Sequence, residues 1–201
     1  MTSLLAYAAA APNGALLEAE YRPAVHVRPA LPADAVAVCE VLRRSIRECC
    51  FPDHGSNPQI LARWLDNKTP QTVAGWFSSP ANCSLVAVSE AGIHGVGLLT
   101  GAGKLALCYV QPELLGTGIG SALLRRMEQQ ASDWELPFVS IDSTVTARDF
   151  YIRHGYHAGG MSKIKSGIQA VSLWKYLDDG KAPNQPVAKR GRPCLCGLAS
   201  Q

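Results

Sequence analysis

A glycine-rich bend between an apolar strand and a helix is the feature that most constrains how this chain folds. Residues Leu105–Val110 form a continuous apolar run, typical of a strand that is covered on both faces. Pro112 ends this strand because proline has no amide hydrogen for the sheet ladder, and the bend Leu115–Gly120 follows. Beyond the bend, an apolar face at helical spacing predicts a helix. This face comprises Ile119, Leu123, Met127, Ala131 and Trp134.

The other segments mix strand patterns with helix patterns, which predicts an α/β or α+β fold around one sheet. Further strands are predicted at Val25–Arg28, Ser84–Val88, Gly95–Thr100, Phe138–Ile141 and within Gln169–Trp174. Two helices are predicted after Pro32 and after an Asn57 cap, with a turn at Pro52–Ser56 between them. A short helix is predicted between a Thr146 cap and Gly155, and Tyr156 is expected to pack back against it.

One domain is predicted for residues 24–178, flanked by segments of different composition. The chain has 201 residues and a hydrophobic content of 47%, which suits a single compact core. Residues 1–23 are rich in alanine and have no steady period, so we expect a poorly ordered extension. Residues 179–201 are polar and rich in proline and glycine, so we expect a flexible tail.

Hydropathy and cysteine usage favour a cytoplasmic protein without a membrane partner. No apolar run is long enough to span a bilayer. The apolar start Leu4–Ala11 lacks the preceding basic residue of a secretory signal. The seven cysteines include no CxxC pair, so we expect most of them to be reduced, and the scattered histidines predict no metal site.

The bend itself predicts a site for a phosphate or a pyrophosphate. Glycines let a backbone approach a ligand closely, and the unpaired amides and dipole at the start of a helix favour an anion. A mere connecting turn explains an isolated pattern of this kind about equally well. No Lys-Ser/Thr pair follows Gly120, so phosphoryl transfer is disfavoured, and Ser121 stands where a dinucleotide-binding fingerprint has glycine.

Two stretches of the chain together resemble the GNAT superfamily of N-acetyltransferases. Tyr109–Leu124 is similar to the acetyl-CoA-binding motif of that family. Asp142–Tyr156 is similar to its second signature, a helix that ends in an aromatic residue after glycine. Both signatures occur in the family's order, which is more specific than either alone. The resemblance covers about residues 25 to 177 and implies a single GNAT-like domain with a mixed central sheet and helices on both faces.

The resemblance implies that acetyl-CoA is a co-substrate and that its acetyl group passes directly to a primary amine of a small molecule or a peptide. The pantetheine arm is expected along the end of the apolar strand, where a backbone amide near Val110 can polarise the thioester carbonyl. Ser143 matches a position where relatives place a polar side chain near the pantetheine, although a helix-entry role explains it nearly as well. The expected cofactor-binding residues are Cys108, Tyr109, Val110, Leu115, Gly116, Thr117, Gly118, Ile119, Gly120, Ser121 and Ser143.

Tyr151 is the candidate catalytic residue. By resemblance it matches the family tyrosine that donates a proton or a hydrogen bond to the leaving thiolate, for which a phenol has comparable basicity. Spacing alone favours a core aromatic beside Phe150. Covalent catalysis by Cys108 is disfavoured, because an apolar strand raises the pKa of a thiol.

Two departures from the family pattern leave an alternative function open. Leu115 stands where relatives usually carry arginine or glutamine, and no carboxylate lies between Glu90 and Glu113 to serve as the general base. The alternative is therefore a non-catalytic sensor that binds acyl-CoA. Asp53 and His54 lie in the region that forms part of the acceptor wall in the family, so His54 is a candidate base. Residues of these types are more often ordinary turn residues without a catalytic role.

The sequence says little about partners. The acceptor pocket is expected from loops at Asp53–Asn57 and Lys68–Pro80, whose residues carry no recognisable code. Lys189–Pro193 resembles the core of an AT-hook, but a net charge of +3 and a single short copy favour a solvated tail over nucleic-acid binding. The oligomeric state is left open, a homodimer included.

Overall fold

A computed structural model describes residues 24–163 and 167–177 of the chain. The predicted extension 1–23, the predicted tail 179–201 and the basic motif at Lys189–Pro193 lie outside these residues. The strands are β1 His26–Pro29, β2 Asn82–Ser89, β3 Gly92–Thr100, β4 Leu105–Val110, β5 Phe138–Thr144, β6 His157–Lys163 and β7 Gln169–Tyr176. The helices are α1 Ala35–Cys49, α2 Phe51–His54, α3 Pro58–Leu65, α4 Pro70–Ser78, α5 Ile119–Asp133 and α6 Arg148–Arg153, with 3-10 turns η1 Pro32–Asp34 and η2 Pro112–Leu114.

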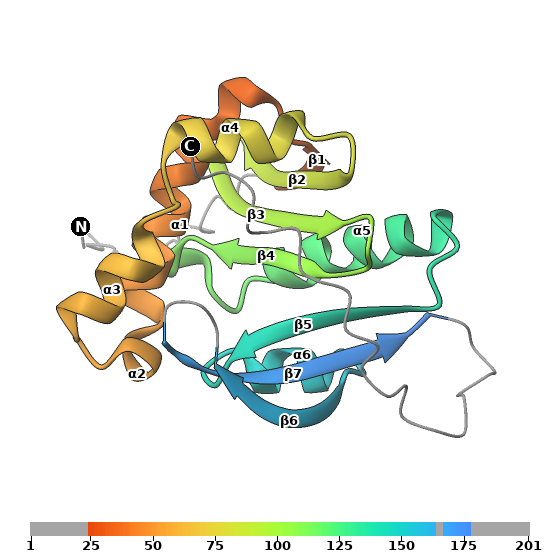
Figure 1. Ribbon diagram of the computed structural model, residues 1–201. Coiled ribbons are helices and arrows are strands. Elements are labelled where there is room, and N and C mark those ends of the chain that lie inside the picture. Colours follow the sequence, from red (N-terminus) through yellow and green to blue (C-terminus); the bar gives the residue numbers. More distant parts are fainter. Residues whose placement is uncertain (1–23, 164–166, 178–201) are drawn as a thin grey trace, which may run out of the picture.

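The sheet consists of two antiparallel parts that meet between β4 and β5. The first part has the order β1-β2-β3-β4 and the second has the order β5-β7-β6. β4 and β5 run side by side in the same direction (Figure 1) and share one parallel bridge, between Lys104 and Ser140. There the Ser140 amide donates to the Gly103 carbonyl at 2.8 Å. This arrangement confirms the expected mixed α+β fold, and it leaves the facing edges of β4 and β5 open toward Val110.

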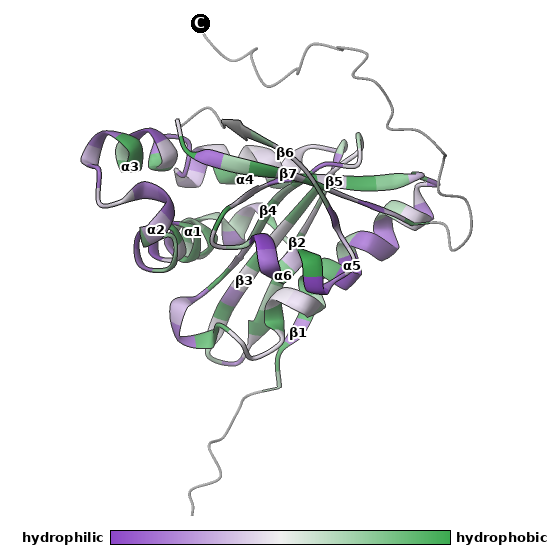
Figure 2. Cartoon of the chain, turned by 90° about the horizontal axis from the view of Figure 1, so that it is seen from below, coloured by the Kyte–Doolittle hydropathy of each residue, from purple (hydrophilic) through white to green (hydrophobic). Residues whose placement is uncertain are grey.

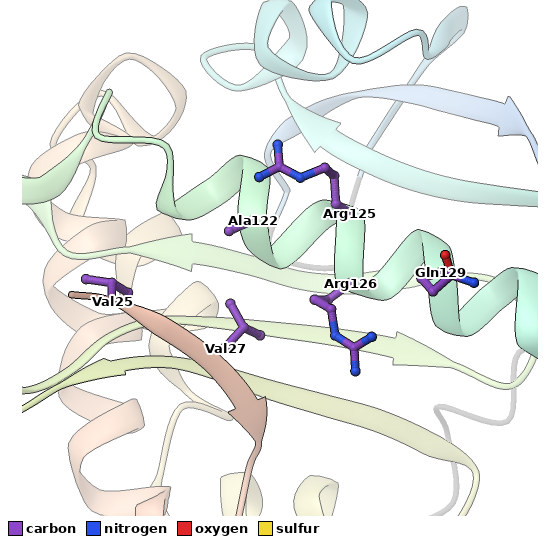
Figure 3. Close-up of a pocket in the computed structure, with 6 residues that line it drawn as sticks. All are labelled: Val25, Val27, Ala122, Arg125, Arg126 and Gln129. Atoms are coloured by element: carbon purple, nitrogen blue, oxygen red, sulfur yellow. The ribbon is translucent and has the colours of Figure 1, made fainter.

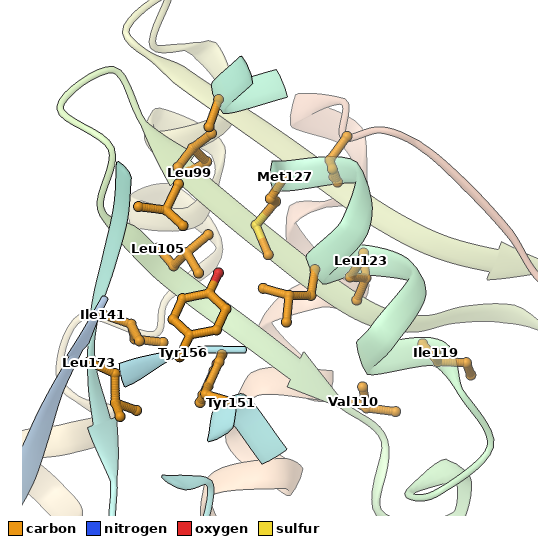
Figure 4. Packing of buried hydrophobic residues seen from close by; sticks show 14 of the residues in the cluster. Leu99, Leu105, Val110, Ile119, Leu123, Met127, Ile141, Tyr151, Tyr156 and Leu173 are labelled. Atoms are coloured by element: carbon orange, nitrogen blue, oxygen red, sulfur yellow. The ribbon is translucent and has the colours of Figure 1, made fainter. Parts of the chain in front are cut away.

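Helices cover both faces of the first part of the sheet. On one face, α1 and α4 pack against the side chains of Val86, Val96 and Leu98. On the other face, α5 packs its apolar stripe against a second cluster (Figure 4), which extends to β5, β7 and α6. Gly97 allows this approach, because a Cβ there would lie 2.9 Å from the Met127 sulfur. Figure 2 shows the apolar residues concentrated along the central strands and the hydrophilic residues on the outer helix turns.

Several local predictions are confirmed. β4 has the predicted bounds, and α5 starts at Ile119, within the glycine-rich bend. Gly155 has a φ of +83° after α6, and Tyr156 is 2% exposed behind it.

Four segments differ from the sequence-based expectation. The predicted turn at Pro52–Ser56 begins with the short helix α2, and the predicted loop Lys68–Pro80 contains α4. Strand β6 was not predicted. Thr146 does not cap α6; the Thr144 hydroxyl accepts from the Ala147 amide instead, at 3.2 Å.

The predicted Asn57 cap is present and gives a stability test. Its side-chain oxygen accepts from the Gln59 amide at 3.0 Å and from the Ile60 amide at 3.2 Å, so two amides of the first turn of α3 are satisfied. We expect Asn57→Ala to lower the free energy of unfolding by about 1 kcal/mol, measured by urea denaturation. Asn57→Asp keeps the acceptor and should retain the stability. Equal stability of the alanine variant and the original chain would contradict this role.

Candidate active site

A large cavity occupies the opening between β4 and β5. Its volume is about 1300 Å³, and its wall includes both strands, the start of α5, helix α6, and α3 with the segment that follows it. The cavity therefore joins the two faces of the sheet: the bend before α5 lies at one end, and α3 lies at the other. Such a passage allows two ligands to meet at the strand edges from opposite sides.

The bend presents unpaired backbone amides to this cavity. Gly116 and Gly118 have φ values of +77° and +93°, and a Cβ at either position would meet no atom within 4 Å. Within the described ranges, the amides of Gly116, Gly118, Gly120 and Ser121 donate to no protein acceptor. Because they cluster at the N-terminus of the 15-residue helix α5, they form a site that favours a phosphate-type anion.

The open edge of β4 supplies further donors. The Gln111 amide donates to the His94 carbonyl at 2.8 Å, toward β3. Because backbone groups alternate between the two edges of a strand, the amides of Val110 and Cys108 point the other way, toward β5. The Gln111 side chain fixes this end of the strand by donating to the Ile93 carbonyl at 3.0 Å.

Tyr151 reaches the cavity from α6 and is 3% exposed. Its ring packs edge to face on Phe150 and Tyr156, with centroid separations of 5.0 and 5.5 Å, and it lies deep in the cluster drawn in Figure 4. Burial raises the pKa of the Tyr151 phenol well above its ordinary value, with a further contribution from the adjacent Cys108 thiol. The phenol is therefore protonated at neutral pH, as a proton donor must be.

Cys108 lacks the properties of a nucleophile. Burial raises the pKa of its thiol to about 11, although the hydrogen bond with Tyr151 acts in the opposite direction. At pH 7 the reactive thiolate is then a very small fraction of the total. The five described cysteines, Cys39, Cys49, Cys50, Cys83 and Cys108, are all free thiols.

A serine–histidine pair lies beside the bend. His154 Nδ1 lies 2.8 Å from the Phe150 carbonyl, which can only accept, so Nδ1 carries the hydrogen. His154 Nε2 then faces the Ser121 hydroxyl at 2.9 Å. Both residues line the cavity. The sequence gives no signal for this pair, because Ser121 and His154 stand 33 positions apart along the chain.

His54 is held in a structural role. It is 4% exposed; its Nδ1 accepts from the Ser56 amide at 3.1 Å, and its Nε2 lies 3.3 Å from the Arg47 carbonyl. With both nitrogens engaged, this ring is not placed to act as the base considered above. Asp53 joins α2 to the connection after β5, since its Oδ1 accepts from the Thr146 amide at 3.3 Å.

Most of the predicted site residues meet at the cavity, and two do not. Those that line it are Cys108, Tyr109, Val110, Leu115, Gly116, Gly118, Gly120, Ser121, Ser143 and Tyr151. The Thr117 hydroxyl instead donates to the Leu114 carbonyl at 2.7 Å, and Ile119 is packed into the core at 5% exposure. Ser143 belongs to β5 and not to a helix entry; it is 2% exposed, and its hydroxyl donates to the Thr144 carbonyl at 2.8 Å.

A second, open hollow lies elsewhere, between β1 and α5 (Figure 3). It measures about 470 Å³ and is lined by Val25 and Val27 from the strand side and by Ala122, Arg125, Arg126 and Gln129 from the helix. Arg125 and Arg126 form no ion pair with any residue of the described ranges.

In the described part of the chain, no three side chains of the His, Cys, Asp or Glu type gather closely enough to hold a metal ion. None of the helices in these ranges has the length and apolar character that crossing a bilayer requires.

Comparisons with known proteins place this fold and cavity in context. Residues 53–177 match the family model of the acetyltransferase (GNAT) domain. The structure is similar to that of the GCN5-related N-acetyltransferase from Rhodopseudomonas palustris, with a TM-score of 0.67 and 22% identity over 77% of this chain and 95% of that one. The PaiA N-acetyltransferase from Thermoplasma acidophilum, solved in complex with coenzyme A, gives a TM-score of 0.62 and 16% identity over 76% and 99% of the two chains.

A third similar structure is the ribosomal-protein-S18-alanine N-acetyltransferase from Escherichia coli, with a TM-score of 0.58 and 11% identity over 81% of this chain and 99% of that one. At these identities the structural likeness establishes the fold alone. No curated protein matches the chain. The family model, however, spans more than half of the chain, and the residues that it matches include the bend and β4. The chain is therefore a member of the GNAT acetyltransferase family.

Proposed function

We propose that this protein is an acetyl-CoA-dependent N-acetyltransferase that transfers the acetyl group directly to a primary amine. The observation that carries the proposal is the continuity between the unpaired amides of the bend and the open edge of β4 within one cavity. An anionic cofactor group held at the bend can extend its arm along that edge to Tyr151. The solved complex of the Thermoplasma acidophilum relative with coenzyme A supports this choice of ligand.

The residues of the bend and of β4 fit coenzyme A. The amides of Gly116, Gly118, Gly120 and Ser121 would receive the pyrophosphate, and the absence of side chains at the glycines leaves room for it. The Val110 amide, which is nearer the bend, would hydrogen-bond the pantetheine arm as an added strand does, and the Cys108 amide would face the thioester carbonyl. Leu115 is 55% exposed at the rim and contributes no charge, so binding of the pyrophosphate rests on backbone groups.

The chemical step then follows from the groups around the strand edge. The nitrogen of a neutral amine attacks the thioester carbonyl, a C–N bond forms, and the Cys108 amide, beside Tyr151, stabilises the developing oxyanion. The C–S bond breaks, and the coenzyme A thiolate takes the proton of the Tyr151 phenol, which solvent later replaces. The proton on the new amide nitrogen leaves to water. β4 offers no carboxylate to take it, and Asp142 on β5 is paired with Lys104 at 2.7 Å.

Binding and turnover test this function separately. Acetyl-CoA is expected to bind saturably in isothermal titration calorimetry. It is also expected to stabilise the fold by about 2.7 kcal/mol at a ligand concentration of 100 times Kd. Release of free coenzyme A thiol is then followed across a panel of primary amines that includes polyamines, amino acids and peptides. Absence of coenzyme A binding would refute the assignment, and binding without turnover on any amine would favour the acyl-CoA sensor.

A further inference from the structure

Lys68 is a buried cation on the wall of the same cavity. It lies in the segment between α3 and α4 and is 7% exposed. Its ammonium donates to the Asn67 side-chain oxygen and lies 5.5 Å from the centre of the Trp76 ring. No carboxylate within residues 24–163 and 167–177 pairs with it. A buried lysine without a counter-ion is costly, and this one adjoins a space that a ligand can enter.

The Lys68 backbone is held by α1, while its side chain lies near α4. The Lys68 carbonyl accepts from the Cys39 thiol at 2.8 Å and from the Arg43 guanidinium at 3.2 Å. Both partners belong to α1, and Trp76 belongs to α4. Burial lowers the pKa of the Lys68 ammonium to about 8, which still leaves it mostly charged at neutral pH.

The wall of the cavity near Lys68 has an excess of positive charge. Arg63 and Asp66 also line it, and Arg63, like Lys68, forms no ion pair within the described chain. Lys104 is neutralised by Asp142 at 2.7 Å. Two unpaired cations therefore face one carboxylate, so an anionic group would be attracted to this end.

This end is not where the cofactor phosphates are expected. Lys68 is held by α1 and α4, which cover one face of the sheet, whereas the bend opens α5, which covers the opposite face. The ligand that meets Lys68 is accordingly the acceptor. The Asn67 oxygen already accepts from the Lys68 ammonium, so the Asn67 amino group is left as a second donor beside it. Two adjacent donors match the two oxygens of a carboxylate.

We propose that Lys68 and Asn67 bind a carboxylate of the acceptor, so that the preferred substrates are primary amines that carry a carboxylate, such as amino acids or short peptides with a free C-terminus. The inference rests on the proposed N-acetyltransferase function and specifies its substrate class. Lys68 acts here as a binding residue for the acceptor and takes no part in bond making.

Matched acceptors test the inference. Aliphatic ω-amino acids of two to six carbons are each compared with the corresponding ω-amino carboxamide, and coenzyme A release is measured. For at least one chain length, kcat/KM for the acid should exceed that for the amide by about tenfold or more, as expected for a charge-assisted pair. Lys68→Met should reduce this ratio to near one, mainly by lowering kcat/KM for the acid.

Two further variants control for charge and folding. Arg125→Met removes a positive charge from the hollow between β1 and α5 and should leave the acid-to-amide ratio unchanged. Lys68→Arg keeps the charge and should retain part of the preference if Lys68→Met is poorly folded. Equal use of acids and amides, or a preference for acids that survives Lys68→Met, would overturn the inference while leaving the acetyltransferase function intact.

A binding measurement separates this inference from the function on which it rests. The same acids and amides are titrated by calorimetry into protein saturated with coenzyme A. If the original chain binds the acids but not the amides, and Lys68→Met binds neither, the carboxylate site is supported even when no acetyl transfer is observed. Equal binding of acids and amides, or binding of neither at millimolar concentration, overturns it. A preference for inorganic phosphate over every carboxylate in this titration would also overturn it.

Discussion

Replacing Gly118 by valine is expected to lower the affinity for acetyl-CoA at least about 100-fold, which corresponds to about 2.7 kcal/mol. Gly118 has a φ of +93° and stands directly before α5. A β-branched residue avoids this conformation, so the bend would relax and turn its amides away from the pyrophosphate. Charge-assisted hydrogen bonds from backbone amides contribute about 1.5–3 kcal/mol each, so the loss of even one or two produces the expected effect. Isothermal titration calorimetry measures it directly.

Gly92→Val provides the matched control for backbone strain. Gly92 has a φ of +121° at the start of β3, beside the tight turn from β2, and a Cβ there would also meet no atom within 4 Å. It does not line the cavity. This variant should lose stability to thermal unfolding yet bind acetyl-CoA as the original chain does. If Gly118→Val bound acetyl-CoA normally, the bend would not be the pyrophosphate site.

The parts of the fold that could be predicted are those in which the signal is local. The apolar run of β4, the spacing of the α5 stripe and the glycine stop after α6 each depend on residues within one segment. The bend could be located for the same reason, since Gly116 and Gly118 adopt the positive φ values that glycine tolerates without strain.

The missed elements depend on partners that are distant in sequence. Helix α4 contains a glycine and buries only Val73 completely, so its apolar pattern in the sequence is weak. Its position depends on packing against α1. Strand β6 contains Gly159, and a glycine within a segment argues against predicting a strand there. In the fold that glycine is required, because a Cβ there would lie 2.6 Å from the Trp174 ring on β7.

The candidate site shows the same division. Family motifs identified the bend and Tyr151, which lie in two continuous stretches. Lys68 and His154 have no such signature, since the burial of Lys68 arises from Cys39 and Trp76 and the contact of His154 arises from Ser121. Only the tertiary structure shows that these side chains share a cavity with the bend.

Tyr151→Phe is expected to lower kcat at least about 100-fold, within the range that general acid catalysis contributes. The ring of the variant keeps its packing on Phe150 and Tyr156, so the shape of the cavity is preserved. The variant loses the proton for the departing thiolate and the hydrogen bond between the hydroxyl and the Cys108 thiol. The affinity for acetyl-CoA should therefore change by no more than about threefold, because one hydroxyl with no charged partner contributes little to ground-state binding. Single-turnover kinetics with a saturating amine separates the two quantities.

Tyr156→Phe is the matched control for the loss of a buried phenol. Tyr156 is 2% exposed and does not line the cavity, and its hydroxyl faces the Glu128 carboxylate. Removing that hydroxyl should leave kcat unchanged, because Glu128 takes no part in the reaction. If both variants reduced kcat equally, the effect would come from packing and Tyr151 would not be the acid. If Tyr151→Phe turned over like the original chain, the proton would have to reach the thiolate from water, and the phenol would have only a structural role.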